Sequence, residues 1–437
     1  MKLNLINVSV HKALNFGMKK RGKAANYPAL GLITLAAVTK PDIEVSITED
    51  EHEEIDYDGA DLVGLSFLTP AAYRAYEIAD RFRKNNVRVV LGGVHVSAMP
   101  DEAALHADAI VLGEAEGVWK ELIEDFGRGS LRKVYKETSL FDLARLPMAR
   151  RDLLKRKYYA STNVIQASRG CPFNCEFCSV GDLFGRSTRF RPVKNVIEEI
   201  RTMDRQILVF TDDNLAINKN YSRELFTSLK PLKREWVGEA SWTMGHMPDL
   251  LHLARESGCR GLLIGFESIQ EQEHVRKVSR YKDMRQAYME SINNFHKHGI
   301  AVVGAFVFGF DNDREGIFDD TLNFALESDV DILELNTLIP YPGTPLYARL
   351  KKEGRISTDD WKQYTYYPPG LCFEPRHMSS GTVKKNLGRI YRKFYSFKSM
   401  IPRLFRVGRR YRDIRAFLFL AAVYILFRKR IHHGYKK

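Results

Sequence analysis

The chain has 437 residues, which is enough for two or three domains with hydrophobic cores of their own. Its five cysteines, three of which fall within eight residues, exclude the disulfide framework of a small secreted protein. Residues 1–6 have neither the apolar stretch nor the cleavage site of a signal peptide, so a reducing, oxygen-poor cytoplasm is the expected location.

The formal net charge of +13 comes from the C-terminal tail. Residues 384–437 contain 17 Lys and Arg and one acid, Asp413, whereas the rest of the chain is close to neutral. The tail also contains a 12-residue apolar run, 416–427, which is shorter than the roughly 20 residues needed to cross a bilayer. A short apolar run between basic segments is typical of a helix lying in an anionic membrane surface. A helix docked on the body of the protein is an equal alternative, and RNA binding by the basic tail is a third.

Residues 1–127 alternate short apolar runs with amphipathic ones, which predicts an α/β domain with a doubly wound, Rossmann-like parallel sheet. Strands are expected at residues 4–8, 44–49, 62–67, 87–91 and 109–112. Helices are expected at residues 29–39, 71–85, 101–106 and 116–126.

Ligands bind such sheets at the carboxyl ends of the strands. Glycines there allow the backbone to approach a ligand closely, and the chain has them at 92–93 and 113. The candidate ligand-binding residues at these strand ends are Ser66, Thr69, Gly92, Gly93, His95, Gly113 and Glu114. The segment has no G-x-G-x-x-G motif, which argues against a dinucleotide.

Residues 128–160 are expected to form a connector, and a second strand–helix series begins at Asn163. Its six strands are expected at residues 163–168, 206–213, 236–242, 261–266, 301–309 and 331–338. Residues 161–350 are therefore the second domain, and residues 351–437 are a C-terminal extension. In α/β barrels the chemistry lies at the carboxyl ends of the strands.

Three cysteines follow the first strand of this series with the spacing C-x3-C-x2-C: Cys171, Cys175 and Cys178. Thiolates are soft ligands that hold iron–sulfur clusters. Three ligands on a [4Fe–4S] cluster leave one iron open to bind a small molecule. A zinc site is the alternative, but such sites usually complete four ligands with a second Cys pair, which this chain lacks.

The cysteine motif, with the aromatic Phe177 before its last Cys, resembles that of the radical S-adenosylmethionine (SAM) enzymes. The stretches at 27–31, 64–66, 92–95 and 112–116 resemble the cobalamin-binding domain found in front of many of them. The resemblance covers residues 1–380 and implies a cobalamin domain, a partial (β/α)6 barrel and a basic helical tail. The D-x-H-x-x-G motif of histidine-ligated cobalamin domains is missing, and only His11 lies near its place. We therefore expect cobalamin without a protein histidine on cobalt, or a vestigial domain that binds none.

The resemblance also implies residues for SAM. These candidates are Phe177, Asp212, Asp213, Glu239, Glu267, Ser268 and Gly309. Helix capping by Asp213 and strand packing at Gly309 are the alternatives. Cys372 is a weak catalytic candidate on a loop beyond the last strand, with ordinary packing as its alternative, and Cys259 is expected to pack.

By resemblance, a reduced [4Fe–4S] cluster cleaves SAM to a 5′-deoxyadenosyl radical, and cobalamin assists methylation, cyclisation or related chemistry at an unactivated carbon. The expected partners are a hydrophobic substrate, with lipids among the candidates, an external reductant of the flavodoxin or ferredoxin type, and the inner face of the membrane; nucleic acid is disfavoured. One alternative is a methylthiotransferase-like enzyme acting on RNA or protein, which would carry cysteines before Cys171 that are absent here. A non-enzymatic cobalamin sensor would not need the three-cysteine motif.

Overall fold

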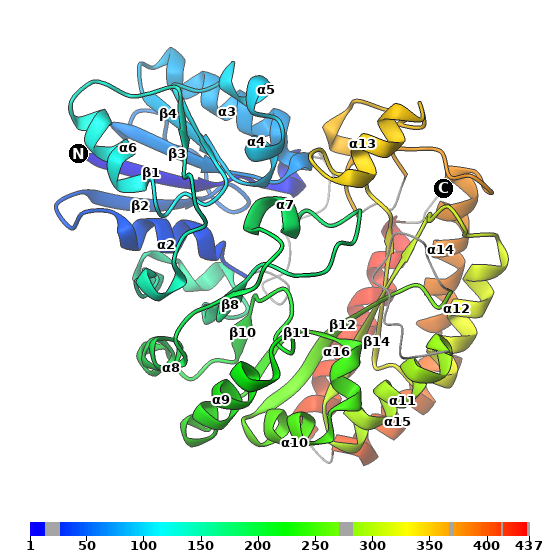
Figure 1. Ribbon diagram of the computed structural model, residues 1–437. Helices are drawn as coiled ribbons and strands as arrows, with labels where there is room; N and C mark the ends of the chain where they lie inside the picture. Colours follow the sequence, from blue (N-terminus) through cyan, green and yellow to red (C-terminus); the bar gives the residue numbers. More distant parts are fainter. Residues whose placement is uncertain (14–26, 271–282, 367–370, 412–413, 435–437) are drawn as a thin grey trace.

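The computed structural model describes residues 1–13, 27–270, 283–366, 371–411 and 414–434. It contains two parallel six-stranded sheets that face each other through their loops, with the C-terminal helices along the far side of the second (Figure 1). The α/β class and the two parallel sheets predicted from sequence are confirmed.

The first sheet has the strand order β2-β1-β3-β4-β5-β6. Its strands are β1 (Lys2–Asn7), β2 (Glu44–Glu49), β3 (Leu62–Ser66), β4 (Arg88–Gly92), β5 (Ala109–Leu112) and β6 (Val134–Lys136). The first five were predicted. The sixth lies in the expected connector, so the sheet extends past residue 127; three residues with only Tyr135 buried give almost no pattern to read.

Helices cover both faces of this sheet, and each face has its own hydrophobic core. They are α1 (Val10–Ala13), α2 (Leu30–Val38), α3 (Ala72–Lys84), α4 (Val94–Ala98), α5 (Pro100–Ala104) and α6 (Trp119–Gly127). Helix α3 buries Ala75, Ile78, Ala79 and Phe82, which recur at helical spacing.

The strand order reverses at β1, which pairs with β2 on one side and β3 on the other. The connections therefore leave these strands in opposite directions and open a crevice at their carboxyl ends. The crevice faces the second sheet.

The second sheet has the order β14-β13-β12-β11-β10-β7, and all of its strand pairs are parallel. Its strands are β7 (Val164–Ile165), β10 (Leu208–Phe210), β11 (Trp236–Ser241), β12 (Cys259–Glu267), β13 (Ala301–Phe308) and β14 (Ile332–Thr337). A short antiparallel pair, β8 (Ser168–Arg169) with β9 (Arg189–Phe190), was not predicted. The covering helices are α8 (Val193–Thr202), α9 (Lys219–Leu229), α10 (Pro248–Glu256), α11 (Met284–Lys297) and α12 (Gly316–Glu327), whereas the short α7 (Val180–Phe184) lies between this sheet and the first one (Figure 1). This curved, open sheet is the expected six-stranded partial barrel.

The C-terminal helices are α13 (Pro345–Lys352), α14 (Ser380–Phe394), α15 (Phe397–Tyr411) and α16 (Ile414–Gly434). Tyr395 accepts a 3.1 Å hydrogen bond from the Leu333 N–H and donates one of 2.9 Å to the Leu333 carbonyl. Tyr391 makes the same pair of contacts with Leu335 at 2.8 and 3.1 Å. The tail is thus docked on β14 (Figure 1), as one alternative had it.

The apolar run 416–427 is divided between the core and the surface. Leu420 and Tyr424 are buried against the barrel, and Tyr424 donates a 2.5 Å hydrogen bond to the Asp331 carbonyl. Leu418 and Ile425 are exposed. The helix therefore docks through one side, and the other side, which includes Leu418, Ile425 and Leu426, is exposed; whether that side contacts a membrane stays a prediction. Among the described residues, no helix is long and apolar enough to span a bilayer.

Candidate active site

The three motif cysteines lie on the loop that follows β8, at the front of the barrel. Gly170 turns the chain into this loop with a φ of +88°, and a Cβ there would lie 2.4 Å from the Ser187 carbonyl oxygen, so only glycine fits. All three cysteines are half-buried, and none of them is in a disulfide. Burial, aided by the neighbouring thiols, raises the pKa of Cys178 to about 12. In the described part of the chain, no three His, Cys, Asp or Glu side chains converge on a single ion.

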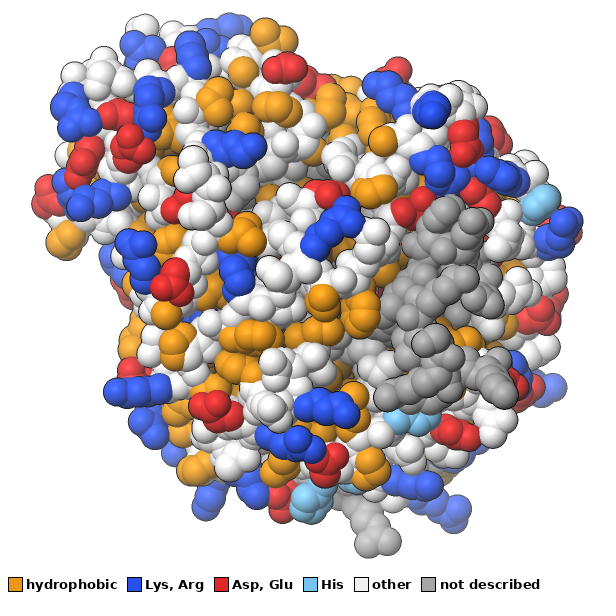
Figure 2. Space-filling model, viewed as in Figure 1, with side chains coloured by type: hydrophobic (Ala, Val, Ile, Leu, Met, Phe, Trp, Pro, Cys, Tyr) orange, Lys and Arg blue, Asp and Glu red, His pale blue; other side chains and the backbone are white. Residues whose placement is uncertain are grey.

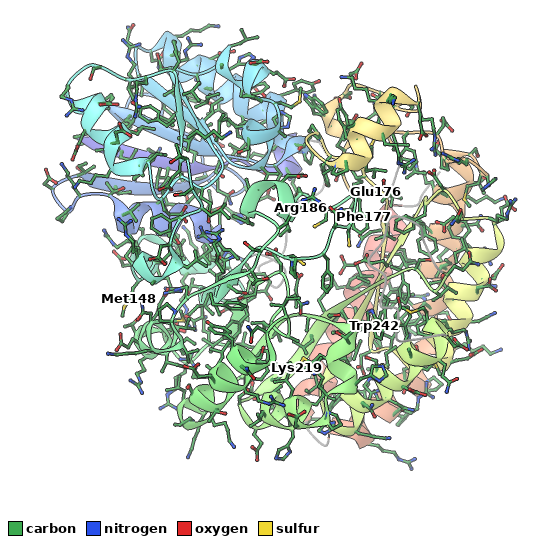
Figure 3. All side chains as sticks on the ribbon, in the orientation of Figure 1. Met148, Glu176, Phe177, Arg186, Lys219 and Trp242 are labelled. Carbon is green, nitrogen blue, oxygen red and sulfur yellow. The ribbon has the colours of Figure 1, made fainter. Side chains whose placement is uncertain are left out.

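A clamp from α13 holds the cysteine loop. Arg349 contacts both carboxylate oxygens of Glu176 at 2.7 and 3.0 Å, and it also reaches Asp311 at 2.7 Å. The Leu346 N–H donates to the Glu176 carbonyl at 2.9 Å. Glu176 and Phe177 lie in the opening between the first sheet and the barrel (Figure 3). Bidentate arginine pairing fixes geometry as well as charge, so the loop is held in place without a bound cluster.

The two acids after β10 accept hydrogen bonds from the segment that precedes the cysteines. Asp212 is buried and accepts hydrogen bonds from the Ala167 N–H at 3.0 and 3.1 Å and from the Ser168 hydroxyl at 2.6 Å. Burial raises its pKa to about 6. Asp213 accepts a 3.2 Å bond from the Gly170 N–H. Both acids therefore hold the segment that leads to the cysteines, and their expected role in SAM binding stays a prediction.

Carboxylates converge on the barrel lumen. Glu239 on β11 faces the open lumen, yet removal of water by the surrounding protein, with the charges of Asp213, Glu334 and Glu267, raises its pKa to about 7. Burial also raises the pKa of Glu334 on β14. Glu334 was not predicted; its signal was an acid between Leu333 and Leu335 on a barrel strand. The lumen suits a cationic group such as an ammonium.

The carboxyl end of β12 is strained. Glu267 has a φ of +63° at an irregularity in the pairing with β13. Such a backbone costs about 1–3 kcal/mol in a non-glycine residue and often marks a functional site. Ser268, directly after it, is buried.

The remaining SAM candidates, Gly309 and Phe177, are not part of the cluster of carboxylates in the barrel lumen. Gly309 is covered by Leu371, Leu338 and Phe373, so its position is explained by packing. Phe177 packs edge-on against Phe310, with 5.9 Å between ring centroids.

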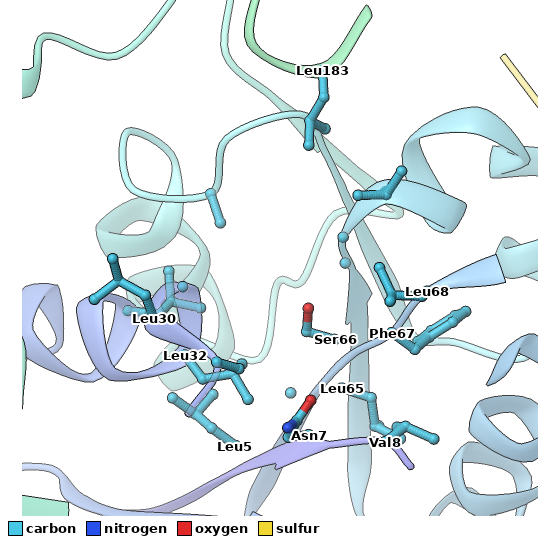
Figure 4. A pocket seen from close by; sticks show the side chains of 18 of the residues that line it. Leu5, Asn7, Val8, Leu30, Leu32, Leu65, Ser66, Phe67, Leu68 and Leu183 are labelled. Carbon is cyan, nitrogen blue, oxygen red and sulfur yellow. The ribbon is translucent and has the colours of Figure 1, made fainter. Parts of the chain in front are cut away.

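A cavity of about 740 Å³ occupies the crevice of the first sheet and is closed on its far side by the barrel loops. Figure 4 shows Asn7, Ser66 and Phe67 on one wall, at the ends of β1 and β3, with Leu183 of the second domain opposite. The predicted residues that line it are Ser66, Gly92, Gly93, Gly113 and Glu114. Residues that sequence reasoning missed are Glu116, Gln166, Arg169, Thr211, Tyr341 and Tyr366.

Thr69 and His95 are not among the lining residues. They are buried behind the Gly93 loop, with 3.3 Å between the His95 Nδ1 and the Thr69 hydroxyl. The Trp361 ring packs edge-on against His95, and its indole N–H donates a 3.0 Å hydrogen bond to Glu102. Burial lowers the pKa of His95. These two residues support the loop from behind, which corrects their expected place beside the ligand.

Cys372 and Cys259 are both fully buried. Cys372 belongs to the core of the first domain, and burial raises its pKa to about 12. A neutral thiol in a core is not a nucleophile, so the catalytic role considered for Cys372 is corrected to packing. Cys259 packs in the barrel core, as expected.

Comparison with known proteins agrees with this geometry. Residues 165–325 match the radical SAM superfamily, and residues 26–123 match the B12 binding domain. The two matches define an enzyme class that joins a radical SAM barrel to a cobalamin-binding domain. The chain belongs to this family of cobalamin-dependent radical SAM enzymes.

Particular relatives cover most of the chain. Bacteriochlorophyllide d C-12(1)-methyltransferase of Chlorobaculum tepidum is 30% identical over 388 residues, which are 86% of this chain and 84% of that protein. The C-8(2)-methyltransferase of the same organism is 31% identical over 358 residues, 77% and 78% of the two chains. The structure of TsrM from Kitasatospora setae, with cobalamin and a [4Fe–4S] cluster bound, shares the fold with a TM-score of 0.61 at 15% identity, covering 80% of this chain and 78% of that one.

The residues present fit the family's cofactors. Three half-buried cysteines on one clamped loop suit a cluster with an open iron. Gly31 and Gly113 both border the cavity, and a Cβ at either position would meet no atom within 4 Å. The backbone at these glycines is therefore open to close approach by a large cofactor such as cobalamin. When bound, the cluster supplies the electron that cleaves SAM and the cobalamin carries a methyl group or electrons; the protein positions and shields them.

Proposed function

We propose that the chain methylates an unactivated carbon of a hydrophobic substrate, with electrons from a flavodoxin- or ferredoxin-type protein. One observation carries the proposal: the cobalamin cavity and the barrel share walls. Gln166, Thr211 and Tyr341 of the second domain line the same space as Ser66 and the glycine loops of the first. A substrate carbon at this junction has access to both cofactors. The two bacteriochlorophyllide d methyltransferases, which are 30% and 31% identical to this chain, support methylation over cyclisation.

The substrate's chemistry is indicated by the surroundings of the junction. Figure 2 shows hydrophobic side chains across the middle of this molecular face, with individual Lys and Arg side chains among and around them. The lumen's carboxylates would repel a substrate that carries its negative charge close to the reacting carbon. We propose a flat or elongated apolar substrate, of the tetrapyrrole or polycyclic lipid type.

The test is anaerobic reconstitution with iron, sulfide and hydroxocobalamin, followed by incubation with SAM, reductant and candidate substrates. Mass spectrometry should find a product heavier by one methyl group. A product that has lost hydrogen without gaining a methyl group would favour cyclisation or oxidation instead.

SAM binding should tighten as the pH rises through about 7, because Glu239 has a raised pKa of about 7 and attracts the SAM ammonium by charge when it is ionised. Below that value, each pH unit should weaken binding about tenfold until other contacts dominate. Isothermal titration from pH 6 to 8 measures this. Glu239→Gln should bind more weakly and without this dependence; an unchanged pH profile in that variant would remove Glu239 from the SAM site.

His11→Ala should leave the visible spectrum of bound cobalamin unchanged. His11 lines the cavity from the short helix α1, but the chain lacks the motif that brings a histidine to cobalt. A spectrum with an imidazole nitrogen on cobalt that disappears in the variant would contradict this.

We also propose that the tail binds an anionic membrane surface through its exposed side. Phe397, Ile401 and Phe405 recur every fourth residue along α15 and are 58%, 50% and 71% exposed. The exposed Lys398 and Arg409 lie on the same helix. Burying each large apolar side chain in the acyl boundary is worth about 1.5–3 kcal/mol. Basic neighbours add about 1 kcal/mol each at an anionic surface, which would bring the enzyme to a lipid-dissolved substrate.

Replacing Phe397, Ile401 and Phe405 together with Ser should reduce co-sedimentation with anionic liposomes. A truncation at Thr382 is unsuitable because it removes Tyr391 and Tyr395 from β14. The matched control replaces three exposed apolar residues elsewhere, Leu105, Met148 and Leu326, with Ser. If the two variants co-sediment equally with the liposomes, the exposed face of α15 is not the membrane-binding surface.

A further inference from the structure

Arg169 connects the two cofactor-binding domains, although it belongs to the loop that carries the cluster cysteines. It is two residues before Cys171, on β8. Its backbone is fixed by the barrel, because Arg169 pairs with Arg189 on β9 and the preceding Ser168 hydroxyl donates to Asp212 at 2.6 Å. The side chain, however, leaves the barrel and enters the first domain.

Each nitrogen of the Arg169 guanidinium has a hydrogen-bond partner. Its Nη1 lies 2.7 Å from a Glu114 oxygen, its Nη2 lies 2.7 Å from a Glu116 oxygen, and its Nε donates to Gln166 at 2.7 Å. The side chains of Arg169, Glu114 and Glu116 are only 6%, 3% and 7% exposed. Arg189 reaches the second oxygen of Glu114 at 2.9 Å. Ion pairs as dry as these are not ordinary surface pairs, which contribute little.

Both acids lie on the loop that follows β5 and lines the cobalamin cavity. Glu114 and Glu116 flank Ala115, which also lines the cavity. One rigid unit therefore runs from the cavity wall through Arg169 to the first cluster cysteine. Any change in its length or direction changes the position of the cavity relative to the cluster.

We infer that Arg169, Glu114 and Glu116 form an interdomain latch, with Arg169 as the positioning residue that sets the distance and orientation between cobalamin and the cluster. The inference rests on the two cofactors of the family and not on the substrate proposed above. Two further charged groups face the latch, Arg189 from β9 and Glu137 from the segment after β6. Burial and the charges of Glu114 and Glu116 raise the pKa of Glu137.

The test measures geometry without substrate. Protein reconstituted with the cluster and cobalamin is reduced to the paramagnetic states of both groups, and their magnetic dipolar coupling is measured by electron paramagnetic resonance. Wild-type protein should show one defined coupling. Arg169→Gln should retain both cofactors but show a broad distribution of couplings, and Arg169→Lys should restore part of the defined signal.

The matched control is Arg403→Gln. Arg403 is also a buried arginine, 1% exposed, and its Nη2 donates at 2.6 Å to the Phe394 carbonyl, but this contact lies within the C-terminal helices and Arg403 does not line the cavity. This variant should lose stability while keeping the wild-type coupling. If Arg169→Gln does not fold, Glu116→Gln removes one side of the latch and carries the same measurement. A wild-type coupling in a folded latch variant would overturn the inference, whereas failure to methylate a chosen substrate would bear only on the proposed function.

Discussion

Replacing Cys171, Cys175 or Cys178 with Ala is expected to abolish reductive SAM cleavage completely. Each thiolate holds one iron of the cluster, and the loop offers no fourth cysteine to replace it. Formation of 5′-deoxyadenosine from SAM and reductant is the measurement, with iron and sulfide content determined on the same samples.

Cys259→Ala is the matched control, because it removes a cysteine that is buried in the barrel core and distant from the motif loop. It should lower the free energy of unfolding while keeping both iron content and SAM cleavage. Full cleavage activity in the variant lacking all three motif cysteines would end the radical SAM interpretation for this chain.

Gly31→Trp is expected to weaken cobalamin binding by about tenfold or more, which corresponds to at least about 1.4 kcal/mol. Gly31 lies in the first turn of α2 and borders the 740 Å³ cavity, and a Cβ there would meet nothing within 4 Å. An indole at this position at the cavity border is therefore expected to fit without straining the fold and to occupy space that the cofactor needs. Binding is measured by the visible absorbance of cobalamin retained after gel filtration.

Gly127→Trp provides the control. Gly127 is exposed at the end of α6, also has open space at its Cβ, and does not line the cavity. It should bind cobalamin as wild type does, and both variants should cleave SAM normally. Undiminished cobalamin binding by Gly31→Trp would place the cofactor elsewhere or leave the domain vestigial.

The sequence predicted the fold well where burial produces a clear pattern. Strands such as β1 and β13 were found to within about two residues, since their apolar runs are bounded by turns. The pair β8–β9 was missed because two-residue strands have no period. The tail was ambiguous because a helix that buries Tyr424 and exposes Leu418 and Ile425 has the same composition as a membrane helix.

The candidate site divides along similar lines. The cysteines could be named because a motif marks them, and Glu239 because it is an acid within a predicted barrel strand. Thr69 and His95 were assigned to the ligand because they follow strand ends, but their side chains are buried in the core. Arg169 and Glu116 are 53 residues apart in the chain, and only tertiary structure shows that they pair.

Tyr391 of α14 and Tyr395, which directly follows that helix, take the place of a neighbouring strand beside β14. This strand is the last of its sheet, and an uncovered edge strand is a template for aggregation by pairing with another chain. Tyr391 and Tyr395 are four helical residues apart, about 6 Å, and they serve Leu333 and Leu335, which are two strand residues apart, about 6.6 Å. The two spacings agree, so one face of a helix reproduces the hydrogen bonds of a seventh strand. Shortened forms of the protein that end before Tyr391 should therefore self-associate through β14.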